Sequence, residues 1–413
     1  MTSPPTPSIE PLRHALPADT ERGPHHYAID GAEPVAGFAP NDRAEVALLL
    51  RTATALGLAV APQAGRTALR AGRPLEAYHV ALDLRGLHRI VEYVPDDLTV
   101  TVEAGMSLRA LQDELAEHGQ YLPVDPAPDD HVTVGGLLAT ARSGAWRGHL
   151  PGARDLVLGI EAVLPSGDRI KSGGRVVKNV TGYDLHRMHT GALGAFGVIV
   201  EASFKVAPRP AATATLAASE GHLDAACALA RRAWDAALPV RAITVLTSET
   251  ARRLDVSSAP TVIVELAGSR AAVERSTADL AAIGPFTDAS PAAWPHLRRL
   301  QGDPHATVLR AGVPPSALTA MLDATRGLDV LAWANVASGA VVMHGRDLDA
   351  AAVRGLRAAA EARGGFLQVE GAPAALRREV DPGGPGDLAL VTALRDRFDP
   401  TRTLNRGRWG AGL

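Results

Sequence analysis

The feature that most constrains the fold of this chain is a set of three glycine-rich segments in its first half. They are residues 62–67 (PQAGRT), 133–140 (TVGGLLAT) and 191–199 (GALGAFGVI). A loop of small residues can aim backbone amides at a phosphate, and paired glycines at a helix start let a ligand approach the backbone closely. The first segment is equally compatible with an ordinary turn, and the second with tight packing of a helix against a strand.

The spacing of these glycines argues against two common nucleotide-binding classes. The third segment lacks the GxGxxG spacing of a nicotinamide-binding loop, and no GxxxxGK[ST] loop of a nucleoside triphosphatase occurs anywhere in the chain.

Hydrophobic periodicity predicts a mixed α and β first half. A helix is expected after Asp42, which can cap it, with an end at Gly57, and a second helix over 107–118 with Ser107 as its cap. The stretch 156–170 is expected to form a hairpin that turns at 165–168. Strands are further expected at 58–61, 80–84, 90–94, 99–102 and 197–206.

Beyond Pro208 and Pro210 the pattern changes to apolar strand candidates and Ala-rich helices. The expected strands are 242–246, 261–266, 307–309 and 330–334, with helices over 271–282, 316–325 and 350–362. The fold class predicted is therefore α+β, with a second domain whose sheet is covered by helices, on one face. We expect three parts: a Pro-rich, loosely packed N-terminal arm over 1–36, a first domain over 37–208 and a second over 209–413.

The composition limits which cofactors, partners and cellular location the sequence predicts. Cys227 is the only cysteine, so the chain can hold neither an internal disulfide nor an iron–sulfur cluster of its own, and we expect this residue in the core. The formal charge of -3 gives no reason to expect nucleic acid as a partner. No apolar stretch is long enough to span a bilayer, and the uncharged run 330–345 fits a buried strand pair better. We expect a cytoplasmic protein.

Taken together, the glycine segments and their neighbours resemble a known family. The series runs from Val102-Glu103-Ala104-Gly105 through Leu122-Pro123-Val124-Asp125-Pro126, the 133–140 segment and Arg154-Asp155 to the Gly-Val-Ile strand at 197–199. In this order it resembles the FAD-binding domain of the vanillyl-alcohol oxidase and p-cresol methylhydroxylase type flavoproteins. The run 176–185 (VVKNVTGYDL) is similar to the FAD-binding subunits of bacterial glycolate oxidases, and Phe398-Asp399-Pro400 with Asn405 and Gly407-Arg408 resembles the family's C-terminal motif.

The resemblance implies a non-covalent FAD site with assigned positions. Segment 65–67 would lie at the pyrophosphate, Pro126 with 133–136 at the flavin and its ribityl-phosphate tail, Ser143 and Gly144 near the isoalloxazine ring, and 197–199 at the adenosine. The implied residues are Gly65, Arg66, Thr67, Pro126, Thr133, Val134, Gly135, Gly136, Ser143, Gly144, Gly197, Val198 and Ile199.

The chain also departs from the family pattern at several positions. The phosphate loop, usually Gly-Gly-Gly-Thr, reads Ala64-Gly65-Arg66-Thr67, and Arg66 is a candidate partner for phosphate. The usual Asn after Ala-Thr is Ala141, the usual Tyr-Gly is Leu150-Pro151, and Arg406 replaces a proline.

Other polar residues have ordinary structural explanations. His186 and His189 have a spacing that can serve a metal, but a solvated helix face is favoured and no metal site is predicted. Lys178 and Asp184 suit ligand or partner contact or a surface ion pair. Four residues of the second domain lie where a substrate pocket is conceivable, although a structural role is favoured for each: Trp333, Asn335, His344 and Glu370.

The resemblance implies an FAD-dependent oxidoreductase, namely the FAD-binding subunit of a glycolate oxidase-like complex that oxidises a small 2-hydroxy acid. Its implied partners are a second flavin subunit and an iron–sulfur subunit, through which the complex can meet a membrane. No general base is assigned. The alternatives are a structural subunit that has lost FAD, and a stand-alone flavin dehydrogenase for another 2-hydroxy acid, alcohol or sugar lactone.

Overall fold

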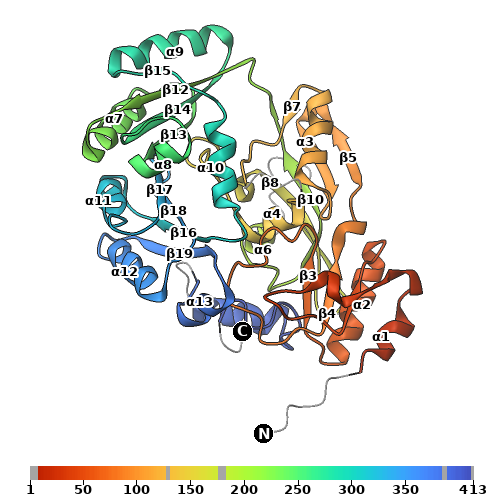
Figure 1. Ribbon diagram of the computed structural model, residues 1–413. Coiled ribbons are helices and arrows are strands. Elements are labelled where there is room, and N and C mark those ends of the chain that lie inside the picture. Colours follow the sequence, from red (N-terminus) through yellow and green to blue (C-terminus); the bar gives the residue numbers. More distant parts are fainter. Residues whose placement is uncertain (1–7, 127–130, 175–182, 384–387, 411–413) are drawn as a thin grey trace.

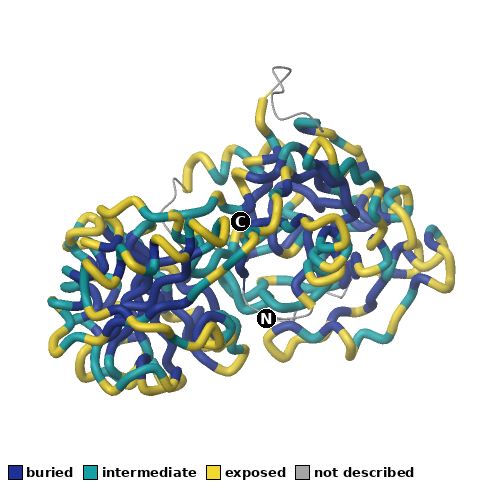
Figure 2. Tube along the Cα trace, turned by 90° about the horizontal axis from the view of Figure 1, so that it is seen from above, coloured by how far each residue is buried: buried dark blue, intermediate teal, exposed yellow. Residues whose placement is uncertain are grey.

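A computed structural model describes residues 8–126, 131–174, 183–383 and 388–410 of the chain (Figure 1). Two buried regions are visible, one in each half of the molecule (Figure 2). The first half contains two main sheets and the second half a single large sheet.

The first sheet is small and has the strand order β1-β2-β4-β3. Its strands β2, β4 and β3 are parallel, and helix α2 packs against them through Val46, Leu49 and Leu50. The elements are β1 (Glu21–Arg22), β2 (Ala36–Phe38), α2 (Arg43–Ala55), β3 (Val60–Gln63) and β4 (Val80–Asp83). Helix α2 begins where the sequence predicts, because the Asp42 carboxylate accepts hydrogen bonds from the amides of Ala44 and Glu45.

The second sheet is antiparallel and has the order β5-β6-β10-β8-β9. The predicted hairpin over 156–170 is confirmed as β8 and β9, with Gly167 in the turn at a φ of 84°. The elements of this region are β5 (Ile90–Val94), β6 (Thr99–Glu103), α3 (Leu108–Glu117), β7 (Gln120–Tyr121), α4 (Val134–Thr140), α5 (Ala153–Leu156), β8 (Val157–Val163), β9 (Arg169–Gly173), α6 (Leu185–His189), β10 (Val198–Lys205) and β11 (Ala207–Pro208).

The second half is built on an eight-stranded antiparallel sheet of order β15-β12-β14-β13-β17-β18-β16-β19. The expected strand pair in 330–345 is confirmed as β17 and β18. The strands are β12 (Ala212–Ser219), β13 (Val240–Leu246), β14 (Thr261–Gly268), β15 (Thr287–Asp288), β16 (Thr307–Gly312), β17 (Leu331–Asn335), β18 (Ala340–Gly345) and β19 (Phe366–Gly371).

Helices cover this sheet on both faces rather than on the one face expected. Along β14, Val262 and Val264 enter one core and Ile263 the other, which explains its continuous apolar run. The outer face carries α7 (Leu223–Asp235), α9 (Arg270–Ile283), α11 (Leu318–Asp323) and α12 (Ala350–Glu361), and the inner face carries α8 (Ser248–Arg253) and α10 (Ala293–Gln301) (Figure 1). The predicted core position of Cys227 on α7 is confirmed.

The expectation of a loosely packed N-terminal arm is wrong for residues 8–36. Helix α1 (Glu10–Ala15) lies beside α2, and Ile9, Leu12 and Leu16 are buried in the same core as α2. The apolar side chains recur at helical spacing, so the prolines start and end short helices there instead of keeping the segment disordered.

The C-terminal segment returns to the first half. After α13 (Ala374–Glu379) and α14 (Leu388–Phe398), Leu404 forms a parallel bridge to Val60 at the start of β3. In consequence residues near both ends of the chain pack around the loop that follows β3. Among the described residues, no helix combines the length and apolarity needed to cross a membrane.

Candidate functional site

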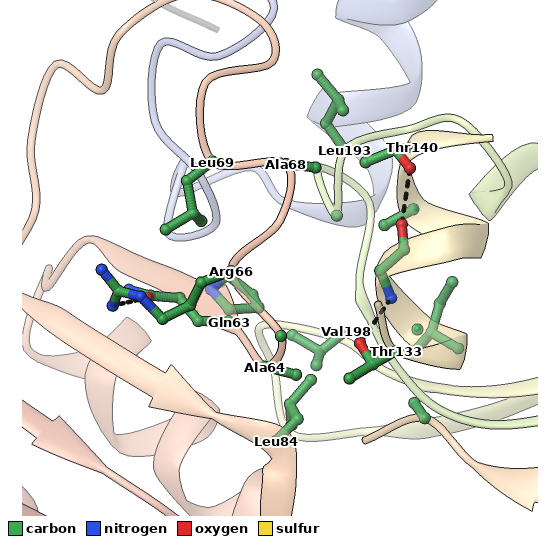
Figure 3. A pocket seen from close by; sticks show the side chains of 18 of the residues that line it. Gln63, Ala64, Arg66, Ala68, Leu69, Leu84, Thr133, Thr140, Leu193 and Val198 are labelled. Atoms are coloured by element: carbon green, nitrogen blue, oxygen red, sulfur yellow. Dashed lines mark hydrogen bonds between the residues drawn. The ribbon is translucent and has the colours of Figure 1, made fainter. Parts of the chain in front are cut away.

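A cavity of about 850 Å³, open mouth included, lies in the first half where the three glycine-rich segments meet (Figure 3). Its walls are formed by residues 62–69, the helix α4 and the segment 193–199, with Asn405 and Arg408 from the C-terminal segment.

The loop after β3 offers unpaired backbone donors to this cavity. The amides of residues 65–68 have no hydrogen-bond partner among the described residues. The chain passes so close to His131 here that a Cβ on Gly65 would stand 1.5 Å from the His131 carbonyl oxygen. Successive free amides of a loop can bind an anion. This is the role that the family resemblance implies for the loop.

Arg66 keeps a backbone conformation that usually requires glycine, with a φ of 62°. Its guanidinium is turned toward Gln63, whose Oε1 accepts from Nη1 at 2.6 Å, while Nη2 donates to the carbonyl of Ala28 at 2.7 Å (Figure 3). The Arg66 side chain is thus already hydrogen-bonded to protein atoms.

The amides of the paired glycines at the start of α4 are engaged within the protein. The Gly135 amide donates to the Ala104 carbonyl at 2.7 Å, and the Gly136 amide to Thr133 Oγ1 at 3.3 Å. A Cβ on Gly135 would lie 3.0 Å from the Cβ of Ala104. The predicted packing of this helix against a strand is therefore present, and the two glycines also line the cavity.

Nine of the thirteen predicted site residues line the cavity, and four do not. The nine are Gly65, Arg66, Thr67, Thr133, Gly135, Gly136, Gly197, Val198 and Ile199. Of the other four, Val134 belongs to the core, Pro126 is buried, and Ser143 and Gly144 lie in the loop between the two halves.

Asn405 and Arg408 of the C-terminal segment are among the cavity-lining residues that were not predicted. Asn405 donates to the Leu193 carbonyl at 2.7 Å, and Arg408 donates through Nη1 to the carbonyls of Leu69, Ala71 and Arg73. Burial lowers the pKa of Arg408 to about 10, so this guanidinium remains charged at neutral pH. The resemblance of the C-terminal motif to the family was a signal that could have placed both residues at the site.

The loop 142–146 is held by side chains of the second half. Ser143 O accepts from Gln301 Nε2 at 2.9 Å and from Arg310 Nη2 at 2.5 Å, and both donors also bond to the Glu370 carboxylate. Arg142 donates to the Glu370 carbonyl at 2.5 Å. Arg310 and Arg142 hold the pKa of the buried Glu370 carboxyl below its usual value, although burial acts in the opposite direction and is the largest single effect.

The other end of this loop rests on Asp125. Its carboxylate accepts from the amides of Gly144 at 3.0 Å and Trp146 at 2.9 Å. Burial raises the pKa of Asp125 to about 6 despite these bonds.

The remaining candidates have structural roles. His186 and His189 are buried, because they lie on the inward face of α6, whereas Arg187 on the other face is exposed. Burial lowers the pKa of His189 to about 4. Asp184 forms an exposed ion pair with Arg187, whereas Lys178 lies outside the described residues. In the second half, Asn335 bonds to the Ala145 carbonyl, His344 to Asp303, and Trp333 is in the core.

Comparisons with known proteins agree with this geometry. The model of the FAD binding domain family matches residues 34–173. Glycolate oxidase subunit GlcE of Escherichia coli is 38% identical over 146 residues, 35% of this chain and 41% of that protein. A D-2-hydroxyglutarate dehydrogenase of Xanthomonas citri is 33% identical over 199 residues, 47% of this chain and 41% of that protein. The matched region thus spans less than half the length of these curated relatives.

The whole fold is similar to that of p-cresol methylhydroxylase, solved with substrate bound. The TM-score is 0.78 at 16% sequence identity, and the alignment covers 98% of this chain and 96% of that one. The fold is therefore of the p-cresol methylhydroxylase type. Residues 34–173 form an FAD binding domain, and FAD is the cofactor that this domain serves.

Proposed function

We propose that this chain is the FAD-binding subunit of a glycolate oxidase-like complex that oxidises a 2-hydroxy acid to a 2-oxo acid. The observation that carries the proposal is the run of unpaired amides at 65–68 on the wall of a cavity within an FAD-binding domain. The glycolate oxidase subunit and the 2-hydroxyglutarate dehydrogenase among the relatives support the substrate class.

In this proposal each wall of the cavity has a separate task. The 65–68 amides hold the pyrophosphate of FAD. Thr133 and the start of the adjacent helix hold its ribityl-phosphate tail, and the 197–199 strand faces its adenosine. Bound FAD supplies the hydride acceptor, and the protein supplies orientation and charge. Arg408 places a buried positive charge at the cavity wall, which favours an electron-rich ligand.

The general base is left unassigned. The described residues that line the cavity include no His, Asp, Glu, Lys or Tyr, the side chains that most often abstract a proton. The proposal therefore places the chain in a complex, with a second flavin subunit and an iron–sulfur subunit as partners, because the single Cys227 cannot hold a cluster.

Anaerobic reduction of the bound flavin tests the proposal. The FAD-loaded chain is mixed with glycolate, D-lactate or D-2-hydroxyglutarate, alone and together with co-expressed partner subunits, and the flavin absorbance is followed. We expect reduction by a 2-hydroxy acid in the complex. Fast reduction in the chain alone would instead identify a stand-alone dehydrogenase, and a chain that takes up no FAD would identify a structural subunit.

A further inference from the structure

The segment that precedes the FAD-binding domain reaches the wall of the cofactor cavity. Residues 24–32, called the N-terminal strap here, lie before residue 34, where the match to the domain begins. They pack on the first sheet through the ring of Tyr27, which lies against Gly37 of β2. The contact is so close that a Cβ on Gly37 would stand only 2.2 Å from a carbon of this ring. The strap is therefore a fixed part of the first half.

Two backbone carbonyls of the strap connect it to the beginning of the cavity loop, one directly through Arg66 and the other through Tyr78. The Ala28 carbonyl accepts from Arg66 Nη2 at 2.7 Å, and the Tyr27 carbonyl accepts from the Tyr78 hydroxyl at 2.8 Å. The Tyr78 hydroxyl in turn accepts from Gln63, and Gln63 Oε1 accepts from Arg66 Nη1 at 2.6 Å. Strap, Tyr78, Gln63 and Arg66 thus form a closed hydrogen-bonded ring.

The strap also contacts the far end of the same loop. Asp30 pairs with Arg377, which is fully buried on α13 and donates to the Gly72 carbonyl at 2.9 Å and the Ala372 carbonyl at 2.9 Å. The loop 63–72 is therefore held at both ends by bonds that lead to a nine-residue strap. Between these two points lie the unpaired amides at 65–68.

The backbone of the loop explains why such support is needed. Arg66 has a φ of 62°, a left-handed conformation that is unfavourable for any residue with a Cβ. Strained conformations persist where the surroundings over-determine them. The two bonds of the Arg66 guanidinium supply that restraint, because they tie the residue to Gln63 and to the strap.

We propose that the N-terminal strap is a positioning device for the cofactor, which preorganises the 65–68 amides for the FAD pyrophosphate through Arg66, Gln63 and Tyr78. This inference rests on the proposed use of the cavity for FAD. A preorganised loop binds more tightly because the ordering has been completed before the ligand arrives. By reciprocity, bound FAD stabilises the strap, although the strap does not line the cavity.

The test compares FAD affinity in four full-length apo proteins by flavin fluorescence titration. Tyr78→Phe removes only the bridging hydroxyl, and Arg66→Gly removes both guanidinium bonds while tolerating the same φ. Tyr93→Phe is the matched control, because it removes a hydroxyl that donates to Gln120 Oε1 at 3.0 Å outside both the strap and the cavity wall. We expect a rise in Kd of roughly three- to tenfold for Tyr78→Phe and about tenfold or more for Arg66→Gly, with Tyr93→Phe within about twofold of wild type.

Hydrogen exchange and thermal unfolding complete the test. FAD should slow amide exchange in residues 24–32 of the wild type, and less so in Tyr78→Phe. Unchanged affinity in both Tyr78→Phe and Arg66→Gly, or equal strap exchange with and without FAD, overturns the strap proposal. If the thermal unfolding curve shows that Tyr78→Phe is not folded at the temperature of the titration, the FAD affinity of Arg66→Gly alone tests the strap proposal. A wild type that binds no FAD overturns the proposed function as well, so the two failures are distinguishable.

Discussion

Arg310 and Glu370 form a buried ion pair, with Nε 2.5 Å from Oε1, at the junction of the two halves of the molecule. The pair lies on β16 and β19, and the same guanidinium donates to Ser143 in the first half. The two side chains are 14% and 7% exposed, so water screens their charges little and removal of one charge is costly for the other.

Glu370→Gln should lower the free energy of unfolding by about 3 kcal/mol, because Arg310 is left buried without its counter-charge. Urea denaturation measures the change. The matched control is Asp323→Asn, which breaks the exposed pair with Arg326 and should cost about 0.5 kcal/mol or less. Equal effects of the two substitutions would show that the buried pair contributes no more than a surface pair.

Acid should destabilise the second sheet. Glu103 and Glu201 are neighbours in the β6–β10 ladder, and Glu161 lies beside Glu201 on β8; Arg43 of α2 contacts all three. Bonds to Arg89 and Arg169 outweigh burial and hold the pKa values of Glu103 and Glu161 below their usual value. Since these folded-state pKa values are depressed, the stabilisation is present above about pH 4.5 and is lost as the pH falls through the folded values.

Arg43→Met should therefore lower the melting temperature at pH 7 and flatten its decline as the pH falls below about 4.5. The Arg43 side chain is 17% exposed, so removal of its charge takes one cationic partner from each of the three carboxylates and should cost about 3 kcal/mol. Arg275→Met, at a site where the side chain is 85% exposed, serves as the control. A pH profile of Arg43→Met parallel to that of the wild type would contradict the role given to this network.

Ala141→Asn should stabilise the protein by about 0.5–1 kcal/mol. Ala141 ends α4 with a φ of 50°, and asparagine tolerates this left-handed conformation better than alanine. Thermal unfolding of the apo protein measures the gain. Ala141→Val should have the opposite sign, because a β-branched residue is strongly disfavoured there, and a lower melting temperature for Ala141→Asn than for Ala141→Val would refute this explanation.

Local signals in the sequence predicted much of the fold. Asp42 and Ser107 cap α2 and α3 as expected, because a cap and its helix are adjacent in the chain. The packed N-terminal segment was missed because its prolines outweighed the helical spacing of Ile9, Leu12 and Leu16. The position of Arg408 depends on contacts with residues more than 300 positions away, which no local pattern reveals.

The candidate site was predicted in its composition but not in its detailed bonding. The three glycine segments do meet, yet the Gly135 amide bonds to Ala104 and the free donors lie in the 65–68 loop. Whether an amide is hydrogen-bonded depends on which residues of other segments lie beside it. The sequence of the glycine segment alone does not give these neighbours. For the same reason the role of Arg66 as a tether to Ala28 could not be read from its charge.

Gly65→Ala should abolish FAD binding, because the new Cβ would stand 1.5 Å from the His131 carbonyl and force the 65–68 amides out of place. Gly221→Ala is a suitable control, since nothing lies within 4 Å of the added Cβ. The fluorescence titration should give a loss of at least about 100-fold in affinity for the first variant and none for the second. Wild-type affinity in Gly65→Ala would place the cofactor elsewhere.

The absorption spectrum of the purified chain after incubation with FAD and removal of the unbound excess tests the central claim most directly. We predict the bands of oxidised flavin at a stoichiometry near one FAD per chain, released from the protein by denaturation because the cofactor is held without a covalent bond. A chain that is folded by circular dichroism and retains no flavin would contradict the claim that this cavity is an FAD site.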